Sequence, residues 1–455
     1  MRFVSTRMKK VFSGGELRVR LKNVAMPIFL ETLLVMMLGA TDTFMLSRYS
    51  DNSVAAVGFV NQIVNLAFLV FQVVALGTSV LCAQYLGAKE GKKEVQVVGI
   101  SIALSTVIGL LVSVALYSGG HAILSIMGLR PDLMADGLPY MKIVGAFAFL
   151  QAISMTLSAS LRAADKAYYP MVVTLVVNVI NLFGNYILIF GAFGMPRLGA
   201  EGAAISTSFS RGVAVVLLFL FLKKKHIPRF PLQWFLPFPK KELGNLLKIG
   251  LPSAGEQISY SLSQVVITYF INMLGNEALT ARAYCMNLVM FSYLLSLAIG
   301  QGGAIVIGHL VGERHSNAAF VFGKYGIKLS IFCTFVISIL LALSGEFIFP
   351  FLTHNKEIIA MGIVILWIDV LLENGRAINI FFVNSLRSAG DIYFCTIVGI
   401  IVMWSVSVGL SYYFGLSLGW GLAGMWFAFL LDENIRGIIF VKRWWGKKWM
   451  SKAFV

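Results

Sequence analysis

The chain has little charge for its length. Only 13% of its 455 residues are Asp, Glu, Lys or Arg, whereas 58% are hydrophobic, and the mean hydropathy is +0.82. A soluble protein of this size does not need so apolar a surface, so we expect a multi-pass membrane protein. The apolar runs are continuous and do not alternate over roughly ten-residue strands, which excludes an outer-membrane barrel and predicts an all-α helix bundle.

Motifs for metal binding, nucleotide binding and hydrolysis are also missing. The four cysteines stand singly, without a C-x-x-C, so the sequence indicates no disulfide framework and no zinc site. No G-x-x-x-x-G-K-[ST] loop occurs, which argues against ATP as the energy source. No Ser/His/Asp grouping suggests a hydrolase. We therefore expect neither an enzyme nor a bound cofactor.

The positive charge that is present lies in a few segments. The formal net charge is +16. Basic residues gather before residue 24, at 89–93, at 223–245 and after 441, whereas the alternate loops hold few. This asymmetry follows the positive-inside rule and predicts that both termini lie in the cytoplasm. The basic excess is thus a topology signal, and we expect no nucleic-acid partner.

Charges, glycines and prolines divide the apolar sequence into twelve predicted spans. They begin near residues 24, 54, 95, 133, 168, 199, 246, 279, 318, 355, 392 and 420. The longest polar break predicts a cytoplasmic linker at 223–245, between an N-lobe at 24–222 and a C-lobe at 246–442. A basic cytoplasmic tail at 1–23 precedes the first span. The Trp- and Lys-rich tail at 443–455 is expected to contact membrane lipid at the headgroup level.

The two predicted lobes repeat each other at a spacing of 225 residues. This shift places Pro27 on Pro252 and Glu31 on Glu256. Because each lobe has six spans, an even number, both enter the membrane from the same side and the repeat is parallel. Two such lobes around a central cleft are typical of a transporter.

Four polar residues fall at a similar depth in the predicted N-lobe: Asp42, Asn181, Asn185 and Thr207. A carboxylate in hydrocarbon is costly, so Asp42 is the leading functional candidate. Asn181 and Asn185 are four residues apart and share a helix face. A carboxylate among amide and hydroxyl oxygens can hold Na⁺ or bind a proton. Alternatively, the amides and the hydroxyl only join neighbouring helices by hydrogen bonds.

Each predicted lobe also contains one glutamate and one arginine at matching places, Glu31 with Arg211 and Glu256 with Arg436. One interpretation is an ion pair within each lobe, Glu31–Arg211 and Glu256–Arg436. The other is that a glutamate faces the cleft and meets a cationic substrate. Pro27 and Pro252, near the starts of spans one and seven, are either hinges or static kinks.

The C-lobe adds a further set of deep charges: Asp369, Glu373 and Arg376 on span ten, and Asp432, Glu433 and Arg436 on span twelve. Spacings of three and four residues predict that most of this set forms an ion-pair network. Asp369 has no basic residue at helical spacing, so we expect it to be a free acid. With Glu373, Glu31 and Glu256 it is a candidate for substrate binding or coupling.

In these residues the chain resembles the multidrug and toxic compound extrusion (MATE) family of secondary transporters. The resemblance rests on Met26 to Thr43, Asn181 to Thr207, Leu161-Arg162-Ala163 and Leu386 to Asp391. It implies export of amphipathic, often cationic compounds in exchange for H⁺ or Na⁺, with Asp42, Asn181 and Thr207 at the ion site. Asn185 differs, since many members have aspartate there, and the missing charge favours H⁺. The segment 373–379 suggests a less-studied bacterial branch.

Two other functions remain open at this point. A related flippase for a lipid-linked oligosaccharide would need Arg211, Arg376 and Arg436 unpaired, to hold a pyrophosphate. A channel or a non-transporting scaffold would not need doubled lobes. For the antiporter we expect a monomer with a small-molecule substrate and no metal beyond a possible Na⁺ near Asp42.

Overall fold

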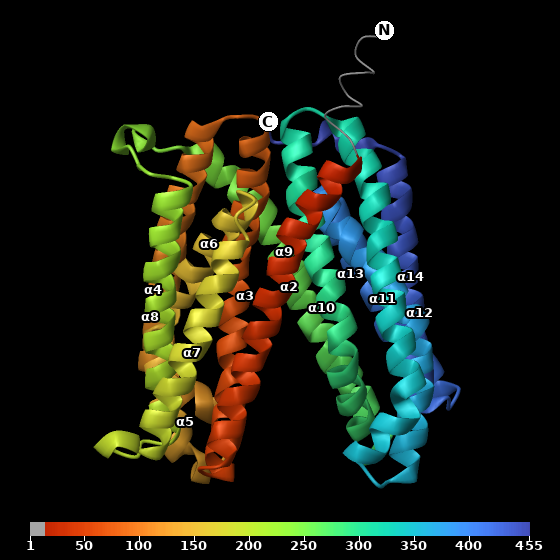
Figure 1. The fold of residues 1–455 in the computed structure, drawn as a ribbon. Helices are drawn as coiled ribbons and strands as arrows, with labels where there is room; N and C mark the ends of the chain where they lie inside the picture. The colour runs from red at the N-terminus through yellow and green to blue at the C-terminus, as the bar shows by residue number, and fades with distance from the viewer. Residues whose placement is uncertain (1–13) are drawn as a thin grey trace. The chain divides into compact units, whose positions relative to one another are not determined.

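The computed structural model describes residues 14–455, and that part of the chain is helical with short connections and no strand (Figure 1). The first half comprises α2 (Gly14–Ser47), α3 (Asp51–Gly87), α4 (Gly91–Ile126), η1 (Pro131–Leu133), α5 (Met134–Ala146), α6 (Ala148–Ala163), α7 (Tyr168–Phe190), η2 (Ala192–Gly194), α8 (Ala200–Lys225) and η3 (Leu232–Phe235). The second comprises α9 (Lys240–Asn272), α10 (Asn276–Gly312), α11 (Ser316–Leu352), α12 (Lys356–Ser388), α13 (Ile392–Val402), η4 (Met403–Val408), η5 (Ser411–Ser417), α14 (Gly421–Trp445) and η6 (Lys448–Ser451).

Twelve elements of the described chain are long enough to cross a bilayer. Nine are apolar helical spans, and α5 with α6 makes a tenth that bends by 47° at Phe147. The other two, α9 and α14, are more polar but have 33 and 25 residues. At 1.5 Å per residue they measure about 50 and 37 Å, more than the roughly 30 Å of a hydrocarbon core. The predicted twelve-span all-α fold is confirmed, with the bend in span four as an addition.

The repeat extends to the helix boundaries and to the turns. The starts of α3 and α10, of α4 and α11, and of η1 and α12 are each 225 residues apart. The turns after α3 and α10 each place one residue in the left-handed region, Lys89 at φ 58° and Arg314 at φ 59°. Asp165 at φ 59° and Gly390 at φ 98° form a second matching pair. The two halves therefore follow one folding plan at the level of individual backbone angles.

Two compact units follow from the internal contacts. The N-unit consists of Leu30–Leu86 and Glu90–Leu251, and the C-unit of the described residues up to Phe29, Gly87–Lys89 and Pro252–Val455. In the N-unit α4 packs on α6, and α8 packs on α5, α6 and α7. In the C-unit α12 packs on α10, α11 and α14. Helices α2 and α9 each contribute to both units, which the proposed lobe boundaries at residues 24 and 246 did not anticipate.

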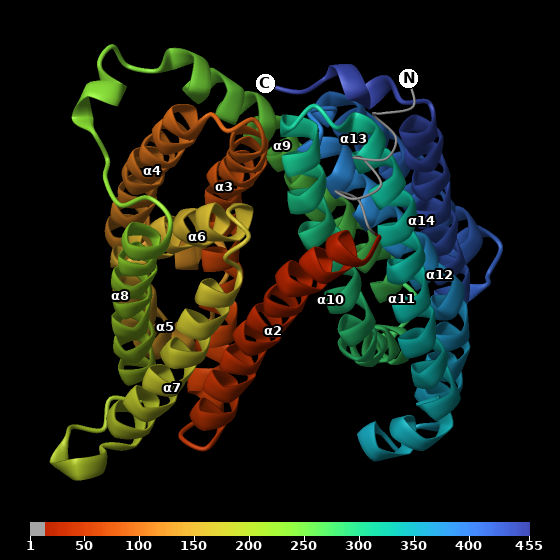
Figure 2. The same ribbon diagram turned by 45° about the horizontal axis from the view of Figure 1, so that its top comes forward.

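The described helices also extend the predicted boundaries. Residues 1–13 of the expected basic tail lie outside the described residues, whereas 14–23 already belong to α2. The predicted linker shortens to residues 226–239, between α8 and α9. This linker passes beside α4 (Figure 2). The Phe235 ring lies so close to Gly99 that a Cβ on Gly99 would be 2.5 Å from it. Hydropathy detects only the part of a helix inside the hydrocarbon, which explains the longer observed helices.

Candidate functional site

The four polar residues predicted to share one depth in the N-lobe form a continuous chain of hydrogen bonds. The Asn185 amide donates to Asp42 Oδ1 at 2.5 Å and to Asn181 Oδ1 at 3.0 Å. The Asn181 amide in turn donates to Thr207 Oγ1 at 3.2 Å. The chain joins α2, α7 and α8 through side chains alone. A carboxylate, two amides and a hydroxyl are thus brought together.

Asp42 lies at the partly exposed end of this chain. Asn181 and Asn185 are fully buried, whereas the Asp42 side chain is half-buried. Asp42 forms no ion pair with any described residue, and Asn185 is its hydrogen-bond partner. The nearby Arg211 guanidinium lies over the Phe68 ring, 5.2 Å from its centroid. The carboxylate is therefore held by a neutral amide and remains available for a proton or a cation.

Close packing of α7 against α8 sets this geometry. A Cβ on Gly184 would lie 2.4 Å from Ser206 Oγ, and one on Gly202 would lie 2.5 Å from the Leu188 carbonyl oxygen. Because Gly184 and Gly202 have no Cβ, the two helices can approach closely, as helices with small residues commonly do in membrane bundles. Ser206 Oγ also donates to the Asn181 carbonyl oxygen at 3.0 Å. The site is built on a rigid helix pair.

The deep glutamates pair with arginines other than the expected ones. In the N-unit, Arg162 Nη1 lies 3.0 Å from both carboxyl oxygens of Glu31. In the C-unit, Arg387 pairs with Glu256. The expected Glu31–Arg211 and Glu256–Arg436 pairs are wrong. Arg162 and Arg387 are themselves 225 residues apart, so the repeat holds and only the choice of arginine was mistaken.

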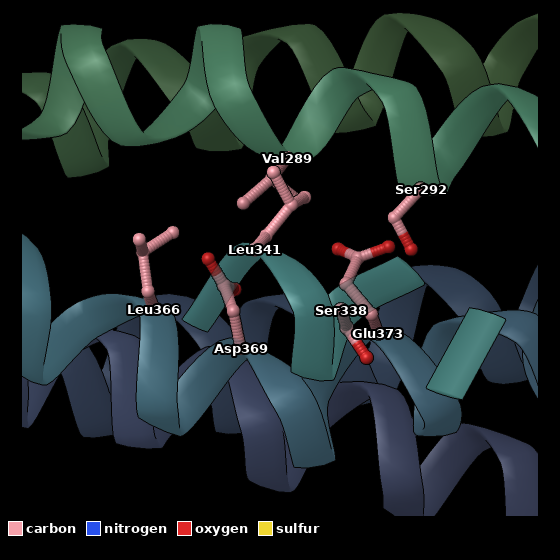
Figure 3. Close-up of a pocket in the computed structure, with 7 residues that line it drawn as sticks. All are labelled: Val289, Ser292, Ser338, Leu341, Leu366, Asp369 and Glu373. Atoms are coloured by element: carbon pink, nitrogen blue, oxygen red, sulfur yellow. The ribbon is translucent and has the colours of Figure 1, made fainter. Parts of the chain in front are cut away.

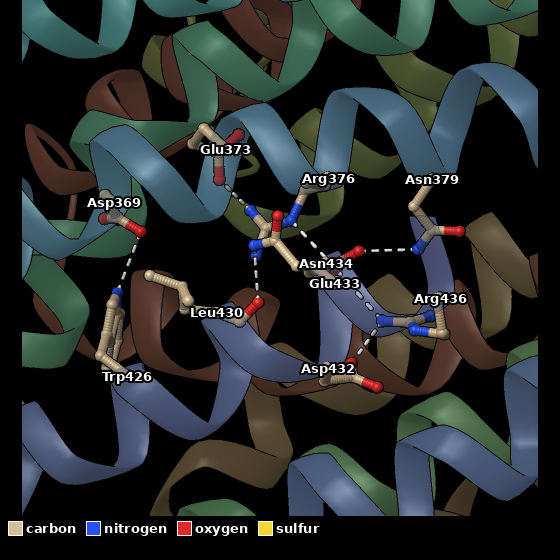
Figure 4. Close-up of polar contacts among 10 residues, drawn as sticks. All are labelled: Asp369, Glu373, Arg376, Asn379, Trp426, Leu430, Asp432, Glu433, Asn434 and Arg436. Atoms are coloured by element: carbon tan, nitrogen blue, oxygen red, sulfur yellow. Dashed lines mark hydrogen bonds and ion pairs between the residues drawn. The ribbon is translucent and has the colours of Figure 1, made fainter. Parts of the chain in front are cut away.

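The C-unit contains the predicted ion-pair network between α12 and α14 (Figure 4). Arg376 pairs with Glu373 on its own helix and with Glu433 on α14, at 3.3 Å. Arg436 lies 2.5 Å from Asp432 and 3.2 Å from Glu433. Asn379 adds a hydrogen bond of 2.6 Å to Glu433. Glu433 is thus the centre of the network.

Asp369 stands outside this network. It is 3% exposed, and its Oδ1 accepts a hydrogen bond from Trp426 Nε1 at 3.1 Å. Its Oδ2 has no hydrogen-bond partner among the described residues, and neither has Glu373 Oε2. Asp369 forms no described ion pair, as its spacing predicted. One buried carboxylate in the C-unit therefore lacks a cation.

Asp369 and Glu373 line one narrow pocket between α10, α11 and α12. The pocket is too narrow to hold a water molecule, and it is lined by Val289, Ser292, Ser338, Leu341 and Leu366 besides the two acids. Figure 3 shows both carboxyl groups directed into this space. The two serine hydroxyls are the only other polar groups in the lining, and no cation lines it.

The charges around this pocket do not balance. The network together with Asp369 contains four carboxylates and two guanidinium groups. The carboxylates are those of Asp369, Glu373, Asp432 and Glu433, and the guanidinium groups are those of Arg376 and Arg436. If all were ionised, the cluster would carry two uncompensated negative charges in a low-dielectric region, which is expensive. Protons or a bound cation must therefore supply part of the balance. No group of three or more His, Cys, Asp or Glu suited to a metal ion occurs within residues 14–455.

Comparison with known proteins agrees with this architecture. The MatE family model matches the chain twice, at residues 27–187 and 252–413. The chain belongs to the MatE family. The two matches coincide with the repeat seen in the helices, and the family comprises transporters rather than enzymes.

Individual MatE relatives cover nearly the whole chain. An "Uncharacterized transporter YisQ" from Bacillus subtilis is 38% identical, over 99% of this chain and 98% of its own. A "Probable multidrug resistance protein NorM" from Thermotoga maritima is 25% identical, over 96% and 94%. Among solved structures, a Vibrio cholerae MATE transporter VcmN in the bent form has a TM-score of 0.88 at 18% identity, covering 96% of this chain and 97% of its own. This last likeness concerns the fold.

Three residues of this chain that contact the buried acids were not singled out from the sequence as their partners: Arg162, Arg387 and Trp426. The two arginines do recur in the repeat, which was the available signal. Nothing in the pattern distinguished them from Arg211 and Arg436, which recur equally well. The Trp426–Asp369 contact joins α14 to α12 and depends on packing, so no spacing rule indicates it.

Proposed function

We propose that the protein is an antiporter that exports amphipathic, often cationic compounds in exchange for H⁺, with Asp42 as the coupling carboxylate. The single observation that carries this proposal is the Asp42–Asn185 hydrogen bond. It leaves a deep carboxylate without a cation partner and connects it to a buried polar chain. Membership of a transporter family and relatives named as multidrug resistance proteins support the export function.

The donor set around Asp42 favours H⁺ over Na⁺. A sodium ion needs several oxygen ligands. Here Asn185 presents its N–H to Asp42, and its second N–H is directed at the Asn181 oxygen. These amide hydrogens would repel a cation at the carboxylate, whereas they leave the other carboxyl oxygen able to take a proton.

Asp369 is the corresponding candidate in the C-unit. A proton at its free Oδ2, or a cationic substrate once the narrow pocket has opened, would reduce the excess negative charge of the cluster. Glu373, facing the same pocket, would share that charge. Glu31 and Glu256 are held by arginines, so we assign them to structure and withdraw them from substrate binding.

The two prolines are suited to act as hinges between the units. Helix α2 passes from the C-unit to the N-unit after Phe29, two residues beyond Pro27. Helix α9 passes from the N-unit to the C-unit at Pro252 itself. A proline removes one helical hydrogen bond and so weakens the helix locally. We propose that α2 and α9 bend there during transport.

The pairing of Arg376 and Arg436 disfavours the flippase alternative. Both guanidinium groups are engaged by carboxylates, so neither is free to hold a pyrophosphate. Of the three arginines that a flippase would need unpaired, Arg211 is the one that forms no ion pair with a described residue. The distribution of basic residues supports an inner-membrane protein with both termini in the cytoplasm. We keep the monomer as part of the proposal.

Proteoliposomes test the proposal directly. The purified protein is reconstituted, and ethidium transport is followed by fluorescence while a pH gradient or a Na⁺ gradient is imposed separately. We expect transport with the pH gradient alone, and its loss in Asp42→Asn. The matched control Asp51→Asn changes an exposed acid at the start of α3 and should transport normally. Transport driven by Na⁺ alone, or an active Asp42→Asn variant, would overturn the assignment.

A further inference from the structure

A basic hollow lies at one end of the C-unit, apart from the carboxylate cluster. It is a cavity of about 440 Å³, and residues of α2, α11 and α14 line it. Arg18, Lys324 and Lys328 provide three cations, Tyr325 and Trp445 two aromatic rings, and Val321 part of the apolar wall. No acidic residue lines it. Three helices distant in sequence thus build one cationic, partly apolar cavity.

The three cations are not neutralised within the described chain. The Arg18 guanidinium lies over the Tyr325 ring at 4.7 Å, and the Lys324 ammonium lies 5.7 Å from the Trp445 ring centroid. None of the three forms an ion pair with a carboxylate of residues 14–455. The Lys324 ammonium also lies 4.6 Å from the Phe320 ring, which is outside the lining. All three cations are exposed, and none is neutralised, so they are available to an anion.

The rest of the lining indicates what kind of anion fits. Val321 is 65% exposed and Trp445 42% exposed, and both border the cavity. A small hydrophilic anion would contact neither side chain. A phosphate attached to acyl chains would contact both, with its charge on the cations and its chains along the apolar rim. Trp and Lys together are also typical of the headgroup level of a membrane.

The depth of the hollow agrees with that level. Helix α11 has 37 residues, so at 1.5 Å per residue it exceeds a roughly 30 Å hydrocarbon core by about 25 Å, or about 12 Å at each end if centred. Lys324 and Lys328 lie eight and twelve residues into the helix, about 12 and 18 Å from its start. Lys324 thus reaches the boundary, and Lys328 can extend its ammonium back towards it.

We propose that this hollow binds the headgroup phosphate of an anionic phospholipid of the inner leaflet. Arg18, Lys324 and Lys328 bind the phosphate, and Val321 and Trp445 contact its acyl chains. The leaflet assignment rests on the cytoplasmic orientation proposed above. The binding itself does not depend on the coupling ion or on the exported compound.

Lipid binding to the purified full-length protein tests this inference. Native mass spectrometry in detergent measures retained phosphatidylglycerol against phosphatidylcholine, and inorganic phosphate serves as the headgroup-only probe. The variant is Arg18→Gln/Lys324→Gln/Lys328→Gln. Its control, Lys223→Gln/Lys224→Gln/Lys240→Gln, removes the same charge from exposed lysines that neither line the cavity nor belong to the 443–455 tail. The single variant Lys328→Gln, which loses no described contact, covers the case in which the triple variant does not fold.

We expect the wild-type protein to prefer phosphatidylglycerol, and each lost cation to weaken that binding about fivefold. Binding of phosphatidylcholine should not change, and the control should stay within about twofold of wild type. Equal losses in both triple variants would show a diffuse electrostatic effect and refute a built site. Inorganic phosphate that competes as well as the lipid would refute the lipid assignment. Proton-driven ethidium transport is measured separately, so failure here leaves the antiporter proposal standing.

Discussion

Removing the arginine from the Glu31–Arg162 pair should destabilise the N-unit strongly. The Glu31 and Arg162 side chains are 11% and 24% exposed, and one guanidinium nitrogen lies 3.0 Å from both carboxyl oxygens. In Arg162→Met the glutamate remains buried without its cation. Breaking a buried pair in this way costs about 3–5 kcal/mol, mainly because the remaining charge has lost its compensation.

This reasoning predicts a specific rescue. In the double variant Glu31→Gln/Arg162→Met no charge remains, so most of the lost stability should return. One kcal/mol corresponds to about 2–4 °C for a unit of 150–250 residues, so Arg162→Met should lower the apparent melting temperature by about 6 to 20 °C. The double variant should lie much nearer to wild type.

Thermal denaturation in detergent, followed by size-exclusion chromatography with fluorescence detection, measures these differences. Arg130→Met is the matched control, because the Arg130–Asp132 pair is exposed at 66% and 53% and should contribute little. Arg387→Met, which breaks the repeat-related pair with Glu256, should behave like Arg162→Met. A double variant no more stable than Arg162→Met alone would refute the view that the stranded charge is the cause.

Two further perturbations follow from close contacts in the N-unit. Gly184→Ala places a methyl group 2.4 Å from Ser206 Oγ, so it should lower the stability by about 1–3 kcal/mol and reduce ethidium transport. The control Gly212→Ala, whose added methyl group would have its nearest neighbour at 3.8 Å, should change neither property. Equal melting temperatures of the two variants would contradict this prediction. Phe235→Ala removes the ring that packs on Gly99 and should speed tryptic cleavage within residues 226–239, which is measured on a gel. Unchanged cleavage would mean that the ring does not hold the linker against α4.

Much of the fold is predictable from sequence because the membrane imposes simple rules. Apolar length gives the spans, and the 225-residue repeat gives the second lobe from the first. The bend at Phe147 and the π-helical η4 and η5 were not foreseen. Hydropathy does not report backbone geometry, so it gives no signal for either feature.

The candidate site was predictable to a similar extent. Depth along the spans placed Asp42 and Asn185 together, since residues at one level of a small bundle have few partners to choose from. The same argument failed for Glu31, because Arg162 and Arg211 both recur in the repeat. Depth and symmetry narrowed the choice to two arginines, and only the packing of helices decided between them.

The repeat itself separates structural charges from functional ones. The Glu31–Arg162 pair recurs as Glu256–Arg387, as expected for a contact that holds each unit together. The cation-free acids do not recur. At the position equivalent to Asp42 the second half has Ile267, and at the position equivalent to Asp369 the first half has Val144.

An acid required by the fold would be required in both halves, since the halves share their helix boundaries and turns. Asp42 and Asp369 instead lie at non-equivalent positions, each deep and each without an ion pair. Such groups lower the stability of the unit that contains them. Their presence is explained most simply if each unit binds a different cationic species, a proton at Asp42 and a proton or the exported cation at Asp369. Asp42→Asn and Asp369→Asn should then abolish transport while raising, not lowering, the melting temperature.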